Sequence, residues 1–500
     1  MLAHVFVRPM PGLAWQRLPW RAALLTAVCV VGLSMRLLYG RGAPLWLDET
    51  FTGVIASQST VTGLLHWLTT ELTGPLFYAP LWAWAKVAGN SDAALRAPSL
   101  IWTLAAPLFA MSRGHRDPLM RFSWAALLLL WLPAAPLAAD ARPYALLLLL
   151  GTLQVAALCA TLRTPTRRAA LGWTATTAAI GFTHYAALIP ALAQGLVLVA
   201  VHRRAMLRLW PTAIPFVLLA GWMVIHLPFA IPVTAKGAAV CTTLGWRGIA
   251  ALPTLVCGSS TLALLLFGAF AMDLVGRRPT LAWPRWQPEG LTTIAGISGF
   301  ALIVGIACVL PGFAPRYLIA AVPTLLFGAS WWLANALRRG APAAAAFLAI
   351  AMLGAASLAA SSWHDTALDQ RHAFELERPS AWLMQEPVDR ILFVWTDTNA
   401  ELAPPDFDAN LAEVGGFFFT RAGHRPKVEL VHATPHIDVA ATVAARLGDD
   451  PRTTILWLAN VPSPDPLRRP DDLMRRSDLL CRDWGLGLSV AVACRRVTRS

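Results

Sequence analysis

Long apolar runs recur along most of this chain, and they restrict its fold more than any other feature. A helix that crosses a bilayer needs about 20 predominantly apolar residues. Hydrophobic residues make up 56% of the 500 residues, which is more than a soluble core requires. The sequence therefore predicts a mainly α protein, a polytopic transmembrane helical bundle. Its candidate spanning segments are 22–40, 75–89, 95–112, 122–138, 143–161, 169–183, 185–201, 210–227, 251–275, 290–310, 317–336 and 342–362.

The basic residues are concentrated in the membrane part of the chain. Residues 1–362 contain 25 Lys and Arg against 8 Asp and Glu, a net charge of +17, whereas residues 363–500 contain 16 against 20, a net charge of −4. Short Arg-rich loops are typical of topology signals, because Lys and Arg accumulate on the cytoplasmic side of a membrane. The basic residues form no stripe interleaved with aromatic residues, so no nucleic acid partner is expected.

Arginine clusters in alternate loops predict which turns face the cytoplasm. The other turns and everything after residue 362 then lie on the non-cytoplasmic side, together with the acid pair Asp48 and Glu49. Segment 75–89 is short for a span, about 22 Å at the helical rise, and a full crossing there would put Arg113 outside. We therefore expect an odd number of spans, eleven or thirteen. The clusters are Arg113, Arg116 and Arg121; Arg163, Arg167 and Arg168; Arg203, Arg204 and Arg208; Arg277, Arg278 and Arg285; and Arg338 and Arg339.

The chain changes character after residue 362. Acids and prolines return, and short apolar runs suit buried strands and one helix. The sequence thus predicts a transmembrane domain, 1–362, followed by a small non-cytoplasmic α/β domain, 363–500. The runs suited to strands are 390–395, 453–458 and 488–493, and the helical stretch is 439–447.

Two of the seven cysteines, Cys481 and Cys494, fall in the second domain. A disulfide between them stays open, because sequence gives no distance. The other five are scattered through the apolar part without ligand spacing. The chain contains no C-x-x-C, H-E-x-x-H, G-x-G-x-x-G or Walker-type loop, which removes the commonest metal-hydrolase and nucleotide-binding functions.

Two adjacent acids, Asp48 and Glu49, follow the first apolar run, in a region where acids are rare. One reading is structural: Asp48 caps a short interfacial helix that starts at Glu49, because Asp is a good N-cap and acids suit a first helical turn. The other reading is that an acid pair at a membrane face performs transfer chemistry. The stretch alone does not separate the two.

More polar and aromatic groups gather on the same predicted face. Charged groups at the ends of apolar segments tend to be paired or functional. Each also has an ordinary explanation: Arg142 and Arg316 suit interfacial anchors, His184 suits a hydrogen-bonded turn, and Glu71 suits a solvated loop. Further alternatives are pairs of Arg96 with Asp92 at i, i+4 and of Asp140 with Arg142. The groups are Glu71, Arg96, Asp140, Arg142, Tyr144, His184, Arg316 and Tyr317.

Taken together, these groups could hold an anionic head group while a carboxylate removes a proton from an acceptor. Phosphate suits arginine, because the planar guanidinium donates two parallel hydrogen bonds. A lipid tail would then run between helices.

Six short motifs in order resemble the GT-C superfamily of polytopic glycosyltransferases over roughly residues 20–360. The similarity is greatest to the family 39 branch, which includes protein O-mannosyltransferases and the lipid A aminoarabinose transferases. The motifs are Leu45-Trp46-Leu47-Asp48-Glu49, Gly74-Pro75-Leu76-Phe77-Tyr78, Leu95-Arg96-Ala97-Pro98-Ser99, Ala141-Arg142-Pro143-Tyr144, Thr183-His184-Tyr185 and Pro315-Arg316-Tyr317-Leu318.

This resemblance implies transfer of a sugar from a polyprenyl-phosphate donor to a lipid, glycan or protein acceptor on the non-cytoplasmic face of the inner (plasma) membrane. It implies that Asp48 is the general base or orients the acceptor, with Glu49 adjacent. Arg142, Arg316 and, less directly, Arg96 would hold the donor phosphate. Tyr144, His184 and Tyr317 belong to the same substrate-binding motifs. Metal use differs across the superfamily, so no metal ligand is assigned and a divalent metal stays open.

The first loop departs from the family pattern. Many relatives carry His or Lys before a Pro, and here the step reads Thr73-Gly74-Pro75. How this loop would contact a phosphate is therefore an open question.

Two other functions compete with glycosyl transfer. A transporter or flippase for an anionic lipid-linked substrate predicts charges near the bilayer midplane and paired broken helices. The key charges lie at segment ends instead. An envelope scaffold would place its function in the tail, residues 363–500.

Overall fold

The computed structural model describes most of the chain. One arginine cluster, Arg277, Arg278 and Arg285, lies outside the described residues. The described ranges are 20–240, 243–276, 287–311, 314–364, 375–397, 407–433, 438–448, 450–460, 467, 469–486 and 489–497.

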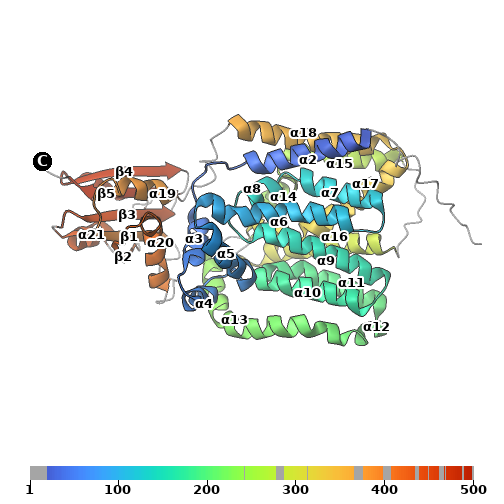
Figure 1. Cartoon of the computed structure of the whole chain (residues 1–500), viewed down its shortest axis with the longest axis horizontal. Helices are drawn as coiled ribbons and strands as arrows, with labels where there is room; N and C mark the ends of the chain where they lie inside the picture. Colours follow the sequence, from blue (N-terminus) through green and yellow to red (C-terminus); the bar gives the residue numbers. More distant parts are fainter. Residues whose placement is uncertain are drawn as a thin grey trace, which may run out of the picture.

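The first part of the chain is a bundle of long helices that run side by side (Figure 1). The long helices are α2 (Trp20–Leu38), α6 (Asp92–Arg113), α7 (Pro118–Leu130), α9 (Tyr144–Arg163), α10 (Arg167–Thr183), α11 (Leu188–His202), α13 (Ile214–Val240), α14 (Trp246–Cys257), α15 (Ser260–Gly276), α16 (Pro288–Val309), α17 (Val322–Arg338) and α18 (Pro342–His364). Shorter pieces are α8 (Ala134–Ala138), α12 (Arg204–Leu207), η1 (Tyr185–Ala187), η2 (Trp210–Ala213) and η3 (Pro315–Ala320).

Six helices in the described ranges are long and apolar enough to cross a membrane. The pair α14 and α15, bent by 78°, makes a seventh if it is one span, and α2 and α7 contain shorter apolar stretches. The predicted polytopic helical architecture is thus confirmed, and the number of eleven or thirteen spans stays a prediction.

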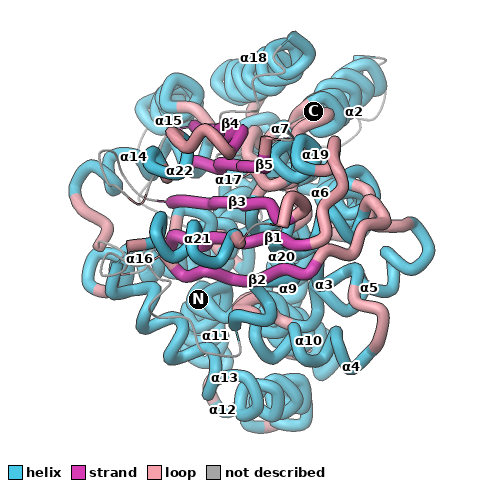
Figure 2. The backbone as a smooth tube through the Cα atoms, turned by 90° about the vertical axis from the view of Figure 1, so that its left-hand side faces the viewer, coloured by secondary structure: helices cyan, strands magenta, loops and turns pink. Residues whose placement is uncertain are grey.

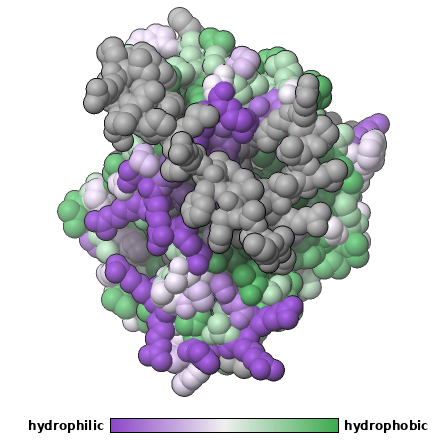
Figure 3. Space-filling model, turned by 90° about the vertical axis from the view of Figure 1, so that its right-hand side faces the viewer, coloured by the Kyte–Doolittle hydropathy of each residue, from purple (hydrophilic) through white to green (hydrophobic). Residues whose placement is uncertain are grey.

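Three shorter helices, α3 (Leu47–Ser57), α4 (Val61–Thr70) and α5 (Pro75–Ala88), form the first loop at one end of the bundle (Figure 1). Segment 75–89, predicted as a candidate that is short for a full crossing, forms α5, which packs beside α3 at this end and is not among the helices long enough to cross. Because α5 lies at the end of the bundle and does not cross it, Arg113 is not placed on the outer side, which a full crossing would have required. The turns after α6, α9 and α17 lie at the opposite end, where hydrophilic side chains gather (Figure 3).

The C-terminal part is a five-stranded sheet with helices on both faces, as predicted for an α/β domain (Figure 2). The strand order is β2-β1-β3-β5-β4; β1 is parallel to β2 and β3, and β5 is antiparallel to β3 and β4. The strands are β1 (Arg390–Asp397), β2 (Lys427–His432), β3 (Thr453–Asn460), β4 (Leu479–Leu486) and β5 (Ser489–Arg496). The helices are α19 (Glu377–Leu383), α20 (Phe407–Arg421), α21 (Val439–Leu447) and α22 (Asp471–Met474).

Apolar side chains along a central strand point alternately to the two faces of the sheet, and helices cover both faces. Ile391 and Phe393 of β1 point into the core shared with α20, whereas Leu392 and Val394 point into the core under α21, because successive side chains of a strand face opposite ways. Cys481 and Cys494 face each other across β4 and β5 and form a disulfide, which answers the question left open by the sequence.

The core on the α20 side does not stop at the sheet. Leu45, Ile55 and Trp67 of the first loop belong to the same buried cluster as Phe393 and Phe417 of the C-terminal part. The two parts are therefore packed together, and the division at residues 362 and 363 stays a prediction.

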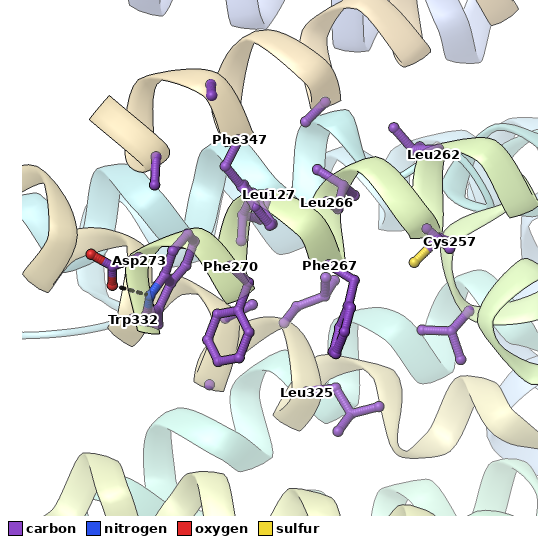
Figure 4. A pocket seen from close by; sticks show the side chains of 18 of the residues that line it. Leu127, Cys257, Leu262, Leu266, Phe267, Phe270, Asp273, Leu325, Trp332 and Phe347 are labelled. Atoms are coloured by element: carbon purple, nitrogen blue, oxygen red, sulfur yellow. Dashed lines mark hydrogen bonds between the residues drawn. The ribbon is translucent and has the colours of Figure 1, made fainter. Parts of the chain in front are cut away.

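A large apolar cavity lies between α15, α17 and α18 (Figure 4). Its volume is about 2030 Å³. Phe267, Phe270 and Leu325 project into it, and at one end Asp273 Oδ2 accepts a 2.8 Å hydrogen bond from Trp332 Nε1. Such an open apolar space along a membrane bundle suits a hydrocarbon chain.

Candidate active site

The acid pair lies in the first turn of α3. The helix begins at Leu47 with Trp46 as its N-cap, so the reading in which Asp48 caps a helix starting at Glu49 was wrong. Glu49 performs the capping instead, because its Oε2 accepts a hydrogen bond from the Trp46 N–H at 3.3 Å. The Asp48 side chain is left 26% exposed and available to other partners.

Glu49 and Arg96 form a buried ion pair. Glu49 accepts from Arg96 Nε at 2.7 Å and from the Ala141 N–H at 2.8 Å, and Arg96 also donates to the carbonyls of Ala43 and Pro44. The pair therefore ties α3, α6 and the turn before α9 together. The alternative pairing of Arg96 with Asp92 was wrong. All three guanidinium nitrogens and both carboxylate oxygens are engaged within the protein, which favours positioning over the catalytic and substrate-binding parts predicted for these residues.

Arg96→Met is expected to lower the free energy of unfolding by about 3–5 kcal/mol, because it leaves the Glu49 carboxylate buried without a countercharge. Arg316→Met, at a side chain that is 44% exposed, is expected to lower it by less than about 1 kcal/mol. Thermal unfolding of the detergent-purified variants measures both. Equal losses in the two variants would contradict the positioning role of Arg96.

Asp48 faces two arginines that are distant in sequence. Its Oδ2 lies 3.2 Å from Arg316 Nη1 and 3.7 Å from Arg142 Nη2, and Arg142 Nη1 donates to its backbone carbonyl at 3.3 Å. Arg142 and Arg316 are 94 and 268 residues away along the chain. Predicted site residues from the first loop, the turn before α9 and η3 thus meet at one end of the bundle.

Arg142 is nearly buried and only partly satisfied. Its Nη1 reaches the hydroxyl of Tyr78 at 3.3 Å, whereas its Nε makes no hydrogen bond within the described residues. Burial alone would lower its pKa, but Tyr78 and Asp48 raise it well above the usual value, so the guanidinium stays charged. Among the described residues, one of its N–H groups is therefore left without a partner.

Glu71 belongs to this cluster, so its interpretation as a solvated loop charge was wrong. The side chain is 15% exposed, its Oε1 lies 3.9 Å from Arg142 Nη1, and the Tyr78 hydroxyl donates to it at 3.4 Å. Burial raises the pKa of Glu71, Asp48 adds to the rise, and Arg142 opposes it.

The departure from the family pattern at Thr73-Gly74-Pro75 has a steric reason. The Gly74 N–H donates to the Thr183 carbonyl at 2.9 Å, and a Cβ at position 74 would lie 1.9 Å from the Phe182 carbonyl oxygen. Only glycine allows this approach. The close contact fixes the loop on the end of α10 and holds Glu71 against Arg142.

One alternative paired Asp140 with Arg142, but in the structure Asp140 pairs with a tryptophan. Trp46 Nε1 donates to its Oδ1 at 3.0 Å. Burial, together with the nearby charge of Glu49, raises the pKa of Asp140 from 3.8 to about 7. This acid therefore titrates near neutral pH.

Asp140 is expected to make stability pH-dependent. Because its pKa is higher in the folded state than in the unfolded state, the folded state binds the extra proton between pH 4 and about 7, and stability falls as pH rises through that window. Asp140→Asn is expected to flatten this fall. Melting temperatures from pH 4 to 8 test it, with Asp389→Asn at an exposed acid as the control. Parallel curves for wild type and Asp140→Asn would contradict it.

Aromatic rings and one histidine close the cluster. The His184 ring centroid lies 5.2 Å from that of Tyr317 and 6.4 Å from that of Tyr144. Burial, together with the nearby charges of Arg142 and Arg316, lowers the pKa of His184 to about 4, so its ring is neutral at physiological pH. His184 can therefore exchange hydrogen bonds with a ligand but does not add positive charge.

A second polar cluster lies at the other end of the bundle. His115, Cys159 and Glu289 bring ligand-type atoms within 4.8 Å of one another. However, Arg163 Nη2 sits among them, 2.5 Å from Glu289 Oε1 and 3.0 Å from His115 Nε2. His115 Nδ1 accepts the Asp117 N–H, and its Nε2 lies 2.9 Å from Glu289 Oε1. These contacts form an ion-paired cluster that joins helices, rather than a metal centre.

The architecture and the polar site define a helical membrane protein whose cluster of charged groups lies under a small C-terminal α/β domain. No protein-family model and no curated protein matches the chain. Two solved structures share its fold: ArnT from Cupriavidus metallidurans in the apo state, 12% identical with a TM-score of 0.53, and the same protein bound to undecaprenyl phosphate, 13% identical with a TM-score of 0.56. They cover 95% and 98% of this chain and 97% and 99% of theirs. The predicted GT-C-like fold is thereby confirmed.

Proposed function

We propose that this chain is an integral membrane glycosyltransferase that moves a sugar from a polyprenyl-phosphate donor to an envelope acceptor on the non-cytoplasmic face of the inner membrane. The observation that carries the proposal is Asp48 facing Arg142 and Arg316. An ArnT structure of the same fold binds undecaprenyl phosphate, which supports a lipid-linked donor.

In this proposal Arg142 and Arg316 bind the donor phosphate. Two guanidinium groups from different elements can grip two phosphate oxygens. The bond between the anomeric carbon and the phosphate oxygen breaks, and polyprenyl phosphate leaves with one more negative charge. The arginines stabilise that charge as it develops, which lowers the barrier.

Asp48 takes the acceptor proton. The acceptor oxygen forms a bond to the anomeric carbon while its hydrogen passes to a carboxylate oxygen of Asp48. Arg316 is 44% exposed at its side chain, so it can turn from Asp48 to the phosphate and release the carboxylate for this work. Glu49 and Arg96 position the helix that carries Asp48.

The apolar cavity between α15, α17 and α18 accommodates the donor chain in this proposal (Figure 4). Helix α14 lines the cavity through Pro253 and Cys257, and its Leu252 belongs to the same buried cluster as Leu318 of η3, the element that also contains Arg316. One helix therefore separates the cavity from the phosphate-binding turn.

Filling the cavity is expected to weaken binding of long donors. Ala329→Trp inserts a large side chain among the lining residues, so the KM for a long-chain polyprenyl-phosphate sugar should rise about tenfold, a loss of roughly 1.4 kcal/mol. A short-chain donor should be affected little. Ala220→Trp, on an exposed position of α13 away from the cavity, is the matched control. An equal rise in KM for both donors would contradict the assignment.

The proposed function is tested by reconstitution. Purified protein in proteoliposomes is given radiolabelled polyprenyl-phosphate sugars and envelope lipids, and transfer to an acceptor is followed. Mass spectrometry of envelope glycans and glycolipids from a deletion strain and its parent identifies the missing sugar and its acceptor. Identical glycans together with no transfer from any donor would reject the proposal.

A transporter or flippase for an anionic lipid-linked substrate is the second candidate, and the bent pair α14 and α15 favours it, because transporters use broken helices. The described residues contain one such pair, and the charged site lies at the bundle end. Substrate accumulation in proteoliposomes without any acceptor would favour transport over transfer.

A further inference from the structure

Helix α20 lies between the sheet of the C-terminal domain and the first-loop helices α3 and α4 (Figures 1 and 2). Its residues Asn410, Glu413, Phe417 and Arg421 are spaced three and four apart, so they share one face. This face turns toward the membrane domain. The opposite side of α20 packs on the sheet. There Gly415 lies so close to Phe393 that a Cβ at position 415 would be 2.6 Å from the Phe393 ring.

The first half of this face holds α4 and the end of α3. Asn410 accepts from His66 Nε2 at 3.0 Å and donates to Thr70 Oγ1 at 3.0 Å. Glu413 Oε2 accepts from Trp67 Nε1 at 3.0 Å and from Gln58 Nε2 at 2.8 Å. These hydrogen bonds join side chains more than 300 residues apart in the chain.

The second half holds α3 and α6. The Phe417 ring lies against Gly53, and a Cβ at position 53 would be 2.5 Å from Phe417 Cζ. Arg421 donates to Asp92, the first residue of α6, at 2.6 Å and to Glu377 at 2.9 Å. Just before α3, an isolated antiparallel bridge joins Trp46 to Glu375, a further residue of the C-terminal part.

The helices that α20 contacts include α3 and α6, which position Asp48, the proposed base. Helix α3 contains Asp48 one turn before Gly53, and α6 contains Arg96 one turn after Asp92. Among the described residues, the hydrogen bonds and ring contacts of the α20 face reach α3, α4, α6 and α19 but neither Arg142 nor Arg316. The contacts of α20 therefore act directly on the helices that place Asp48, whereas Arg142 and Arg316 approach Asp48 from the turn before α9 and from η3.

We infer that α20 is a positioning element for the active site: through Asn410, Glu413, Phe417 and Arg421 the C-terminal domain sets the orientation of Asp48 relative to the bound donor. The catalytic consequence rests on the proposed function, whereas the mechanical coupling of α20 to α3 does not. Loosening this contact therefore slows proton removal and leaves donor binding intact.

The central experiment introduces a steric clash between position 53 and Phe417 and then relieves it with a smaller side chain at position 417. Gly53→Ala raises helix propensity by about 1 kcal/mol, so any loss in this variant comes from the collision with Phe417. We expect kcat to fall about tenfold, with undecaprenyl phosphate binding unchanged. Adding Phe417→Leu makes room for the new methyl group and should restore kcat.

Glu413→Ala, which removes the hydrogen bonds to Trp67 and Gln58, should lower kcat without a steric clash. Glu429→Gln, at an acid that pairs with Arg390 within the sheet, is the matched control.

Hydrogen exchange of the peptide 46–57 is measured on the same full-length proteins. We expect faster exchange in Gly53→Ala and Glu413→Ala, and wild-type exchange in the rescued double variant and in Glu429→Gln. Unchanged exchange in both α20-contact variants would overturn the inference, as would a loss of undecaprenyl phosphate binding equal to the loss of kcat, or a failure of Phe417→Leu to rescue. If exchange responds as expected while the wild-type protein transfers sugar from no donor, the proposed function fails and the mechanical coupling stands.

Discussion

Asp48→Asn is expected to lower kcat for sugar transfer by about 100- to 10,000-fold, the usual contribution of a positioned general base. An amide cannot take the acceptor proton, although it keeps the size of the side chain. The same change removes the negative charge 3.2 Å from Arg316 Nη1 and 3.7 Å from Arg142 Nη2. Both arginines then attract an anion more strongly, so undecaprenyl phosphate should bind as tightly as to wild type or more tightly.

This opposite response of kcat and donor affinity distinguishes a lost base from a damaged fold. Initial rates with saturating donor give kcat, and equilibrium binding of undecaprenyl phosphate gives affinity. Asp389→Asn, at an acid of the C-terminal domain whose side chain is 61% exposed, is the control and should change neither. Transfer at the wild-type rate by Asp48→Asn would remove Asp48 from the chemistry.

The meeting of the site residues was predictable because each signal came from a turn on the same face. Apolar runs gave the helices, and arginines in alternate loops assigned the turns to sides, which brought Asp48, Arg142, His184 and Arg316 to one end. Apolarity sets helix length, but it does not decide whether a short helix crosses. The sequence therefore left open whether segment 75–89 crosses fully, since its position depends on packing against α3.

The partners of each charge were less predictable. Glu49 was grouped with Asp48 as catalytic, and only the fold shows that Arg96 reaches Glu49 rather than a phosphate. The burial of Glu71 depends on the close approach of Gly74 to the end of α10, a contact between segments over 100 residues apart that has no local sequence signal. For the same reason the contact of α20 with the first loop was invisible in the sequence.

Arg142→Lys is expected to lower kcat/KM by about 100- to 10,000-fold, because two or more charge-assisted hydrogen bonds worth roughly 1.5–3 kcal/mol each are lost. Lysine keeps the positive charge, but a single ammonium group cannot reach the Asp48 carbonyl, the Tyr78 hydroxyl and a phosphate at once. Binding of undecaprenyl phosphate should weaken along with catalysis, which is the reverse of the response expected for Asp48→Asn.

The size of the effect should depend on burial. Arg316→Lys changes a side chain that is 44% exposed and bonded to Asp48, so a mobile ammonium can follow the phosphate and the loss should be nearer tenfold. Arg167→Lys, on the exposed start of α10 at the other end of the bundle, is the matched control and should leave binding unchanged. If Arg142→Lys bound undecaprenyl phosphate like wild type, the partly satisfied guanidinium of Arg142 would have to serve only the packing of Glu71 and Tyr78, and the phosphate would belong to Arg316 alone.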